Sequence, residues 1–224
     1  MNYVELLSKI MDHGHSTAPR GRDVREIMHA SLTIDQSGNI YVFPNSRPLE
    51  KIMSYLWEEL AWYFSGNQQP AFIAKFASLW DKIKNPDGTL NSNYGRLVFY
   101  NRTPHPTMGN ITLDPFTWAF NCLKNDLETR QAIITYNTGG FNFIGNDDYI
   151  CTQHQAFFVR NNTLDCYVAL RSSDAIYGLT YNMPWWSLVQ QQLFLKLKVF
   201  YPGLGLGPIH IYIYSAHFYA KHYV

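Results

Sequence analysis

Apolar residues recur at helical spacing in several stretches of the chain. The first stripe begins at Tyr3, and it ends before Gly14. The same spacing predicts further helices over residues 49–64, 71–84, 116–123 and 185–200. Because each stripe needs an apolar layer to pack against, these helices are expected to cover a common core.

Other stretches alternate apolar and polar residues with a period of two, which is typical of half-buried strands. In the last of them, Ile209, Ile211 and Ile213 alternate with polar side chains. Strands are predicted over 130–137, 149–160, 163–172 and 209–214, and two more within 30–43, around the hairpin signal Ser37-Gly38-Asn39. Helices and strands do not alternate regularly, which predicts an α+β fold.

Length and composition narrow the class of protein. The 224 residues suffice for a single domain with one large core, so one domain over 1–224 is expected. A net charge of +1 gives no electrostatic reason to bind nucleic acid or a membrane surface. The chain has no run of roughly 20 apolar residues and no signal-peptide core. Its three cysteines do not make a disulfide framework, which favours a cytoplasmic location.

Candidate chemistry is concentrated between Cys151 and Asn182. A thiol is nucleophilic as the thiolate, and Arg171 would supply the positive charge that lowers its pKa if residues 149–172 form a hairpin. A guanidinium also binds phosphate oxygens in pairs. The carboxamide of Asn182 matches the donor and acceptor of uracil. Structural alternatives remain, namely a buried thiol in a strand and a helix N-cap before Met183-Pro184.

Glu59 is a second candidate, on grounds of helical spacing alone. It lies three residues after Leu56 and four before Tyr63, so it shares the apolar face of its helix. Glu58 is rotated about 100° away, toward the polar side. A buried carboxyl is costly unless it is paired or functional, and burial raises its pKa into the range that suits a general acid. A structural salt bridge is the alternative. His13 and His15 lack partners for a metal site, so no metal is predicted.

Taken in order along the chain, these motifs resemble the thymidylate synthase family, which includes the pyrimidine hydroxymethylases of phages. The resemblance extends from about Arg20 to His222. It rests on Trp57-Glu58-Glu59-Leu60-Ala61-Trp62-Tyr63, Trp80, Asn93-Tyr94-Gly95-Arg96, the segment from Cys151 to Asn182, and Ser215-Ala216-His217-Phe218-Tyr219. It implies a large mixed sheet packed by helices and a homodimer formed through the face of that sheet.

The resemblance also implies a role for each candidate residue. Cys151 would be the nucleophile, and Glu59 and Tyr94 would manage protons. Substrate-binding roles fall to Arg20, Arg130 from the partner subunit, Arg171, Ser172, Asp174, Gly178, Asn182, His217 and Tyr219. Trp80 and Asp174 would hold the cofactor, 5,10-methylenetetrahydrofolate. Two choices of register stay open, because Arg22 competes with Arg20 and His210-Ile211-Tyr212 also fits the His-x-Tyr pattern, although the distance from Gly207 favours His217.

The reaction implied is one-carbon transfer to C5 of a pyrimidine nucleotide. Uracil enzymes of the family carry asparagine where this chain has Asn182, which indicates dUMP. The chain stops at Val224, where family members continue into a tail that closes over the ligands. Access of water then favours 5-hydroxymethylation slightly over thymidylate synthesis. Thr152 and Gln131 depart from the usual family residues, which keeps a non-catalytic nucleotide-binding protein as a further alternative.

Overall fold

The computed structural model describes residues 1–35, 40–105, 107–109 and 112–222. The chain forms two compact units, Met1–Arg47 with Cys151–Val224, and Pro48–Ile150. The hairpin signal Ser37-Gly38-Asn39 lies outside the described residues. The expectation of one catalytic domain over 1–224 stays a prediction.

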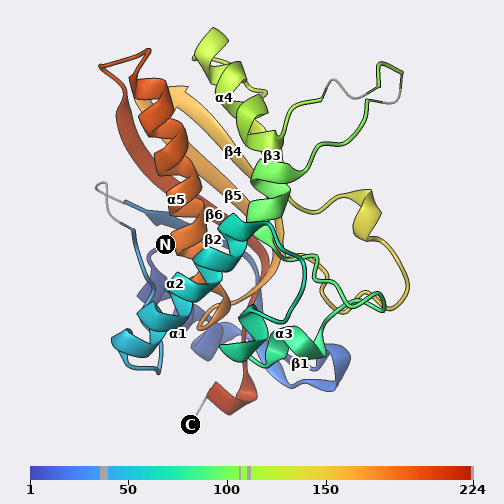
Figure 1. The fold of residues 1–224 in the computed structure, drawn as a ribbon. Helices are drawn as coiled ribbons and strands as arrows, with labels where there is room; N and C mark the ends of the chain where they lie inside the picture. The colour runs from blue at the N-terminus through green and yellow to red at the C-terminus, as the bar shows by residue number, and fades with distance from the viewer. Residues whose placement is uncertain (36–39, 106, 110–111, 223–224) are drawn as a thin grey trace. The chain divides into compact units, whose positions relative to one another are not determined.

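A mixed β-sheet forms the centre of the first unit (Figure 1). Its strands are β1 (His15–Thr17), β2 (Val24–Ile34), β6 (Gly205–Tyr219), β5 (Thr163–Asp174) and β4 (Thr152–Arg160), in that spatial order. β5 and β6 are parallel, whereas β1–β2, β2–β6 and β4–β5 are antiparallel. The α+β class and the mixed sheet predicted from the sequence are thus confirmed.

Local sequence explains the β4–β5 hairpin and strand β6, near whose ends most of the candidate residues lie. β4 and β5 are joined by Asn161 and Asn162, both with positive φ, which is the backbone of a tight two-residue hairpin turn that asparagine tolerates. In β6, Ile209, Ile211 and Ile213 are all at most 1% exposed, as the period of two predicts. β6 extends further than predicted, to Tyr219.

Two helices pack against this sheet. α1 (Tyr3–His13) begins with a capping box between Asn2 and Glu5 and contacts β2. α5 (Gly178–Lys198) contacts β5 and β6. The predicted start near residue 185 was wrong, and Asn182 is not an N-cap, because the helix begins at Gly178 and includes Pro184. Burial against the sheet overrides the cost of the internal proline.

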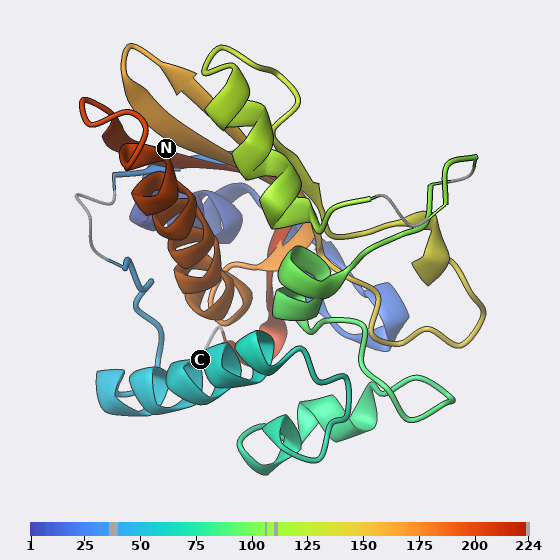
Figure 2. The same cartoon turned by 45° about the horizontal axis from the view of Figure 1, so that its top comes forward.

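The second unit contains α2 (Leu49–Ser65), α3 (Leu79–Lys82), α4 (Pro115–Asn125), β3 (Ile133–Thr135) and the π-helical turn η3 (Arg96–Tyr100) (Figure 2). α4 contacts both η3 and β3, and α2 contacts η3. The strand predicted over 130–137 is shorter than expected, and α2 ends at Gly66 as the sequence predicts.

Two predicted elements were wrong. Residues 71–84 form only the short turns Ile73–Lys75 and Leu79–Lys82. Ile73 is fully buried there, but Phe72 is 39% and Phe76 45% exposed, so no continuous apolar face is buried and a long helix lacks its main source of stability. The described residues 40–47 contain no strand; Phe43 is instead buried, with its ring 4.4 Å from that of Tyr3.

Candidate functional site

The β4–β5 hairpin places Cys151 directly opposite Arg171. The amide nitrogen of Arg171 donates a hydrogen bond of 3.0 Å to the carbonyl oxygen of Cys151, and Thr152 pairs with Leu170. The hairpin that the charge argument required is therefore present. Cys151 is half-buried, whereas burial raises the pKa of the Cys166 thiol to about 12. Cys166 is thus held in the inert thiol form.

The parallel pairing of β5 and β6 brings a second group of candidates together. Asp174 pairs with His217, and Ser172 Oγ lies 3.3 Å from His217 Nδ1. Burial lowers the pKa of His217 below its ordinary value of 6.5, and the nearby Asp174 carboxylate only partly opposes this. At neutral pH the imidazole is therefore neutral, with one nitrogen as donor and the other as acceptor.

The choice between the two His-x-Tyr registers can be judged from their surroundings. His217 and Tyr219 share one face of β6, with ring centroids 5.4 Å apart. His210 lies elsewhere on β6, where Nδ1 is 3.1 Å from Thr33 Oγ1 and the ring stacks on Tyr167 at 4.5 Å. His217 is the histidine that lies beside Ser172 and Asp174. The choice of His217 over His210 stays a prediction.

The β1–β2 turn brings the N-terminal arginines to the same end of the sheet. Arg20 lies in the turn Pro19–Gly21 with a φ of 53°, and both Arg20 and Arg22 are exposed. Val24 of β2 pairs with Tyr219 of β6. This register places the turn next to the His217–Tyr219 end of β6. The choice between the two arginines stays a prediction.

The start of α5 adds Gly178 and Asn182, which lie one helical turn apart and on one side of the helix. A Cβ at Gly178 would be 3.1 Å from Ser173 Oγ and 3.5 Å from Asp174 Cβ, so glycine permits the close approach of α5 to the end of β5. Asn182 is half-exposed. Within the described part of the chain, its carboxamide makes no hydrogen bond, so both of its polar atoms are available to a ligand.

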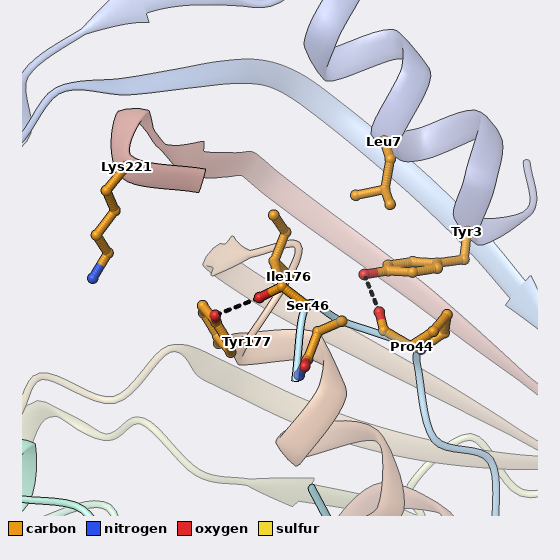
Figure 3. A pocket seen from close by; sticks show the side chains of 8 residues that line it. Tyr3, Leu7, Pro44, Ser46, Ile176, Tyr177 and Lys221 are labelled. Atoms are coloured by element: carbon orange, nitrogen blue, oxygen red, sulfur yellow. Dashed lines mark hydrogen bonds between the residues drawn. The ribbon is translucent and has the colours of Figure 1, made fainter. Parts of the chain in front are cut away.

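A pocket of about 400 Å³ opens beside the β5–α5 connection (Figure 3). The ring of Tyr3 lines one side, and Lys221 and the hydroxyls of Ser46 and Tyr177 are its other polar lining groups besides Asn45. The two hydroxyls are 2.8 Å apart. Nδ2 of Asn45, another lining residue, is buried and finds no hydrogen-bond acceptor among the residues described. An ammonium group, two hydroxyls and an unsatisfied amide donor suit a carboxylate-bearing ligand.

Glu59 projects from the buried face of α2, as its spacing predicts. The side chain is 4% exposed, and this burial raises the pKa of its carboxyl from 4.5 to about 8. The Tyr55 hydroxyl donates a 3.0 Å hydrogen bond to Oε1. Oε2 is buried and makes no well-formed hydrogen bond with a described residue, although a side-chain hydrogen bond from Tyr63 to the carboxyl also lowers the pKa, less than that from Tyr55. Glu59 forms no ion pair with a described residue, so the salt-bridge alternative has no support.

Tyr94 is held against the same helix. It is 4% exposed, and its ring stacks on that of Tyr63 with centroids 5.3 Å apart. A Cβ at Gly95 would overlap the carbonyl oxygen of Tyr63, so only glycine allows the segment to pack this closely. Asn93 Nδ2 donates to the carbonyl oxygens of Trp62 and Asn67 at 2.8 and 2.9 Å. The neighbours of Tyr94 in the sequence, Asn93 and Gly95, therefore both hold it against α2.

Asp148 is a residue of this unit that sequence reasoning missed. Its Oδ2 accepts hydrogen bonds from the amides of Asn91 (2.7 Å) and Ser92 (2.8 Å), and Ser92 Oγ donates to Oδ1. Burial raises the pKa of Asp148, and these hydrogen bonds oppose the rise. The carboxylate anchors the segment that leads to Tyr94. The sequence offers no signal for this, because Asp147-Asp148 resembles an ordinary polar loop.

Trp80 also has a partner that the sequence did not reveal. Its Nε1 donates a hydrogen bond of 2.8 Å to the Tyr55 hydroxyl, and its ring lies 5.0 Å from that of Trp62. Tyr55 therefore connects Trp80 with Glu59. A usable signal did exist, since Tyr55 lies four residues before Glu59 and so on the same side of α2.

The structure thus assembles the candidates in two groups and leaves one apart. The end of the sheet in the first unit carries Arg20, Cys151, Arg171, Ser172, Asp174, Gly178, Asn182, His217 and Tyr219. In the second unit, Glu59, Tyr94 and Trp80 are linked to one another through residues of α2. Arg130 is exposed in the segment between α4 and β3. Their catalytic and binding roles stay predictions.

Two wider features of the described residues concern metals and membranes. Among those residues, no group of three or more histidine, cysteine or acidic side chains is arranged to hold a metal ion. In the same residues, no helix combines the length and the apolar character that crossing a membrane requires.

Comparison with known proteins identifies the family. The family model described as "Thymidylate synthase" matches residues 1–224. The chain is also 26% identical, over 224 residues, to a protein named deoxyuridylate hydroxymethyltransferase from Bacillus phage SP01. This alignment covers 99% of the chain and 57% of the relative, so the chain spans little more than half of the relative's length. On the match along its whole length, the chain belongs to the thymidylate synthase family.

Proposed function

We propose that the protein transfers a one-carbon unit to C5 of dUMP and forms 5-hydroxymethyl-dUMP. The observation that carries this proposal is the pairing of Cys151 with Arg171 across the β4–β5 hairpin, at the sheet end where Ser172 and His217 also lie. A nucleophile beside a guanidinium and a hydroxyl is what covalent attack on a phosphorylated substrate requires.

Phosphate binding falls to Arg171 and Ser172. The Arg171 guanidinium supplies paired donors to the phosphate oxygens, and the Ser172 hydroxyl supplies a further one. Arg20, in the turn at the same end of the sheet, adds charge. Arg130 of a second copy completes the set in this proposal; its exposure is compatible with that role.

The base and the sugar are recognised by neutral polar groups. The carboxamide of Asn182 accepts from N3–H of uracil and donates to O4. Cytosine presents the opposite pattern at both atoms, which favours dUMP over dCMP. The neutral imidazole of His217 and the hydroxyl of Tyr219 bind the sugar hydroxyl, and they project from the same face of β6.

The reaction begins when the Cys151 thiolate forms a bond to C6 of the ring. The electron pair of the C5=C6 double bond moves toward C5 and O4, where a proton from Glu59 stabilises it. Methylenetetrahydrofolate, the one-carbon donor of this family, supplies the carbon that C5 receives. A base would then remove the C5 proton, through water held by Tyr94, so that tetrahydrofolate is lost as the leaving group and an exocyclic methylene remains on C5. Addition of water to this methylene would give the hydroxymethyl group, and the sulfur would leave C6 as thiolate.

The residues present fit this cofactor. The pocket beside Tyr177 offers the Lys221 ammonium and the unsatisfied Asn45 amide, which match the carboxylates of the glutamate part of folate. Asp174, three residues before Tyr177, offers a carboxylate acceptor to the N–H groups of the pterin. Trp80 supplies an aromatic surface. Its indole N–H is already bound to Tyr55, so only the ring would contact the cofactor.

The choice of product rests on the phage relative. Its name specifies hydroxymethyl transfer to deoxyuridylate, and this supports 5-hydroxymethyl-dUMP. Thymidylate synthesis is the second candidate, since the family model carries that name. A nucleotide-binding protein without activity is the third, and it gives no reason for a cysteine to be paired with Arg171 across the hairpin.

A homodimer formed through the sheet is part of the proposal. Large side chains are exposed on β2, β5 and β6, among them Met28 (53%), Tyr167 (40%), Tyr212 (40%) and Tyr214 (42%). A surface with this many exposed aromatic rings is typical of a protein interface. Association through it would allow one copy to donate Arg130 to the other.

The test is release of tritium from [5-³H]dUMP in the presence of methylenetetrahydrofolate, with the product identified by mass spectrometry. Release together with 5-hydroxymethyl-dUMP is the expected result. Release with dTMP would replace the proposed reaction by the second candidate. Absence of release from dUMP, dCMP and UMP would leave nucleotide binding without catalysis.

A further inference from the structure

Three side chains of the second unit form a continuous line of hydrogen bonds. Trp80 Nε1 donates to the Tyr55 hydroxyl at 2.8 Å, and the Tyr55 hydroxyl donates to Glu59 Oε1 at 3.0 Å. Both heavy-atom distances are in the range of well-formed bonds. The line ends at a carboxyl that is 4% exposed.

The chemistry of the three groups fixes the direction of every hydrogen in this line. An indole N–H can only donate, so the Tyr55 oxygen must accept from Trp80. The single hydrogen of the Tyr55 hydroxyl is then directed at Glu59. Oε1 is therefore always an acceptor, whether the carboxyl is ionised or neutral. When Glu59 is protonated, its hydrogen is favoured on the other oxygen, Oε2, because a carbonyl oxygen accepts the Tyr55 hydrogen bond better than a hydroxyl oxygen does.

Oε2 is also the oxygen left open. It is buried and makes no well-formed hydrogen bond with a described residue, so a water molecule or a substrate atom is needed to satisfy it. We propose that Tyr55 and Trp80 are positioning residues that confine the exchangeable proton of Glu59 to Oε2. This inference rests on the proposed function, in which Glu59 exchanges protons with the pyrimidine.

The other titratable groups near this carboxyl do not replace Tyr55. Tyr63, on the same helix, also lowers the pKa of Glu59 through a side-chain hydrogen bond to the carboxyl, but its effect is smaller than that of Tyr55. Tyr94 and Asp148 influence Tyr63, and their effect on it, like that of Glu59, is to raise its pKa. Tyr55 is the group whose hydrogen bond favours the ionised form of Glu59 most, second in size only to the effect of burial.

Replacement Tyr55→Phe tests this directly. It removes the hydroxyl while keeping the ring, and loss of a bond that favours the carboxylate raises the pKa of Glu59 by about one unit. The measurement is a ¹³C NMR titration of the Glu59 carboxyl in the ligand-free protein, with its signal assigned through Glu59→Gln. Tyr100→Phe is the matched control, because it also removes one hydroxyl hydrogen bond, to the carbonyl oxygen of Phe64.

Trp80→Phe provides a second variant that retains Tyr55. Without the indole N–H, the Tyr55 hydroxyl loses the donor that directs its hydrogen at Glu59, so a shift in the same direction but smaller than that of Tyr55→Phe is expected. In tritium release, Tyr55→Phe should move the pH dependence of kcat by the same amount as the NMR titration and leave the KM for dUMP within about twofold.

Two results would overturn the inference. One is a Glu59 titration that is unchanged in Tyr55→Phe, and the other is an equal shift in Tyr100→Phe, which would indicate a general structural effect. Both are obtained from the ligand-free protein, so they stand apart from the proposed function. If the wild-type protein releases no tritium although Tyr55→Phe shifts the Glu59 titration, the proposed reaction is wrong, whereas the proposed positioning of the Glu59 proton still holds.

Discussion

Arg171 donates its backbone N–H to the carbonyl oxygen of Cys151, at 3.0 Å, from the neighbouring antiparallel strand. Cys151 and Arg171 are therefore positioned by backbone pairing, which is insensitive to their side chains. Substitution of either side chain should leave the hairpin intact, so the resulting changes in activity can be interpreted as chemical effects.

Cys151→Ala should reduce tritium release by roughly 10⁴-fold or more, because covalent attack on C6 is lost. Cys122→Ala is the control, since burial raises the pKa of that thiol and no role is proposed for it. Both variants should have the circular dichroism spectrum of the wild type. Wild-type rates in Cys151→Ala would exclude the covalent mechanism.

Arg171→Lys should raise the KM for dUMP about tenfold, because an ammonium group cannot make the paired contacts of a guanidinium. Arg160→Lys is the matched control on the same hairpin, where Arg160 lies beside the turn and is exposed. Steady-state kinetics at varied dUMP measures both. Equal KM values for the two variants would remove Arg171 from the phosphate site.

Asn182→Asp should shift the preference of the enzyme from uracil toward cytosine. A protonated carboxyl can donate to N3 of cytosine and accept from its amino group, whereas it matches uracil poorly. The ratio of kcat/KM for dCMP to that for dUMP should therefore rise by at least about 100-fold. A fall in both values with no change in the ratio would mean that Asn182 does not read the base.

Glu59→Gln should change how stability depends on pH. Burial raises the pKa of Glu59 to about 8 in the folded protein, against an ordinary value of 4.5. Between these values the folded state holds more protons than the unfolded state, so rising pH lowers the free energy of unfolding. Glutamine does not titrate, so the free energy of unfolding of the variant should rise relative to that of the wild type as the pH increases across this interval.

The gain should be on the order of a few kcal/mol between about pH 5 and about pH 8. Urea unfolding at both pH values measures it, and other titrating groups cancel in the difference between variant and wild type. If the difference in free energy of unfolding between variant and wild type stays constant with pH, burial does not raise the pKa of the Glu59 carboxyl.

Lys221→Met should weaken the binding of tetrahydrofolate several-fold and leave the KM for dUMP unchanged, because the lysine lines the pocket beside Tyr177. Quenching of tryptophan fluorescence measures the dissociation constant. Lys9→Met removes the same charge from the exposed side of α1 and should have no effect. An equal loss in both variants would indicate a general electrostatic contribution.

Features that depend on neighbours along the chain were predictable. The spacing of apolar residues in α2 correctly placed Glu59 on the buried face, and the two alternating stretches that became β4 and β5 form the expected hairpin. The pairing of Asp174 with His217 could not be predicted, because parallel strands are joined through a distant connection and no local signal sets their register.

The wrong and missed predictions also depend on contacts between residues that are distant in the sequence. Residues 71–84 have helical spacing, but the fold buries little more than Ile73 there. Pro184 argued for a helix start near Asn182, yet the contacts of α5 with β5 and β6 sustain a helix through it. Tyr55 and Asp148 were missed because their importance lies in contacts with Trp80 and Ser92, which only the folded chain brings close.

The central position of β6 has a consequence for synthesis and folding. Its residues, 205–219, come late in the chain, but they pair with β2 on one side and β5 on the other. Until the ribosome has released them, β2 and β5 present open edges that invite association with other chains. Contacts between residues so far apart in sequence also slow folding. His217 and Tyr219 lie on this same strand, so a chain without it would lack the groups that we propose bind the sugar, and its open strand edges would favour aggregation.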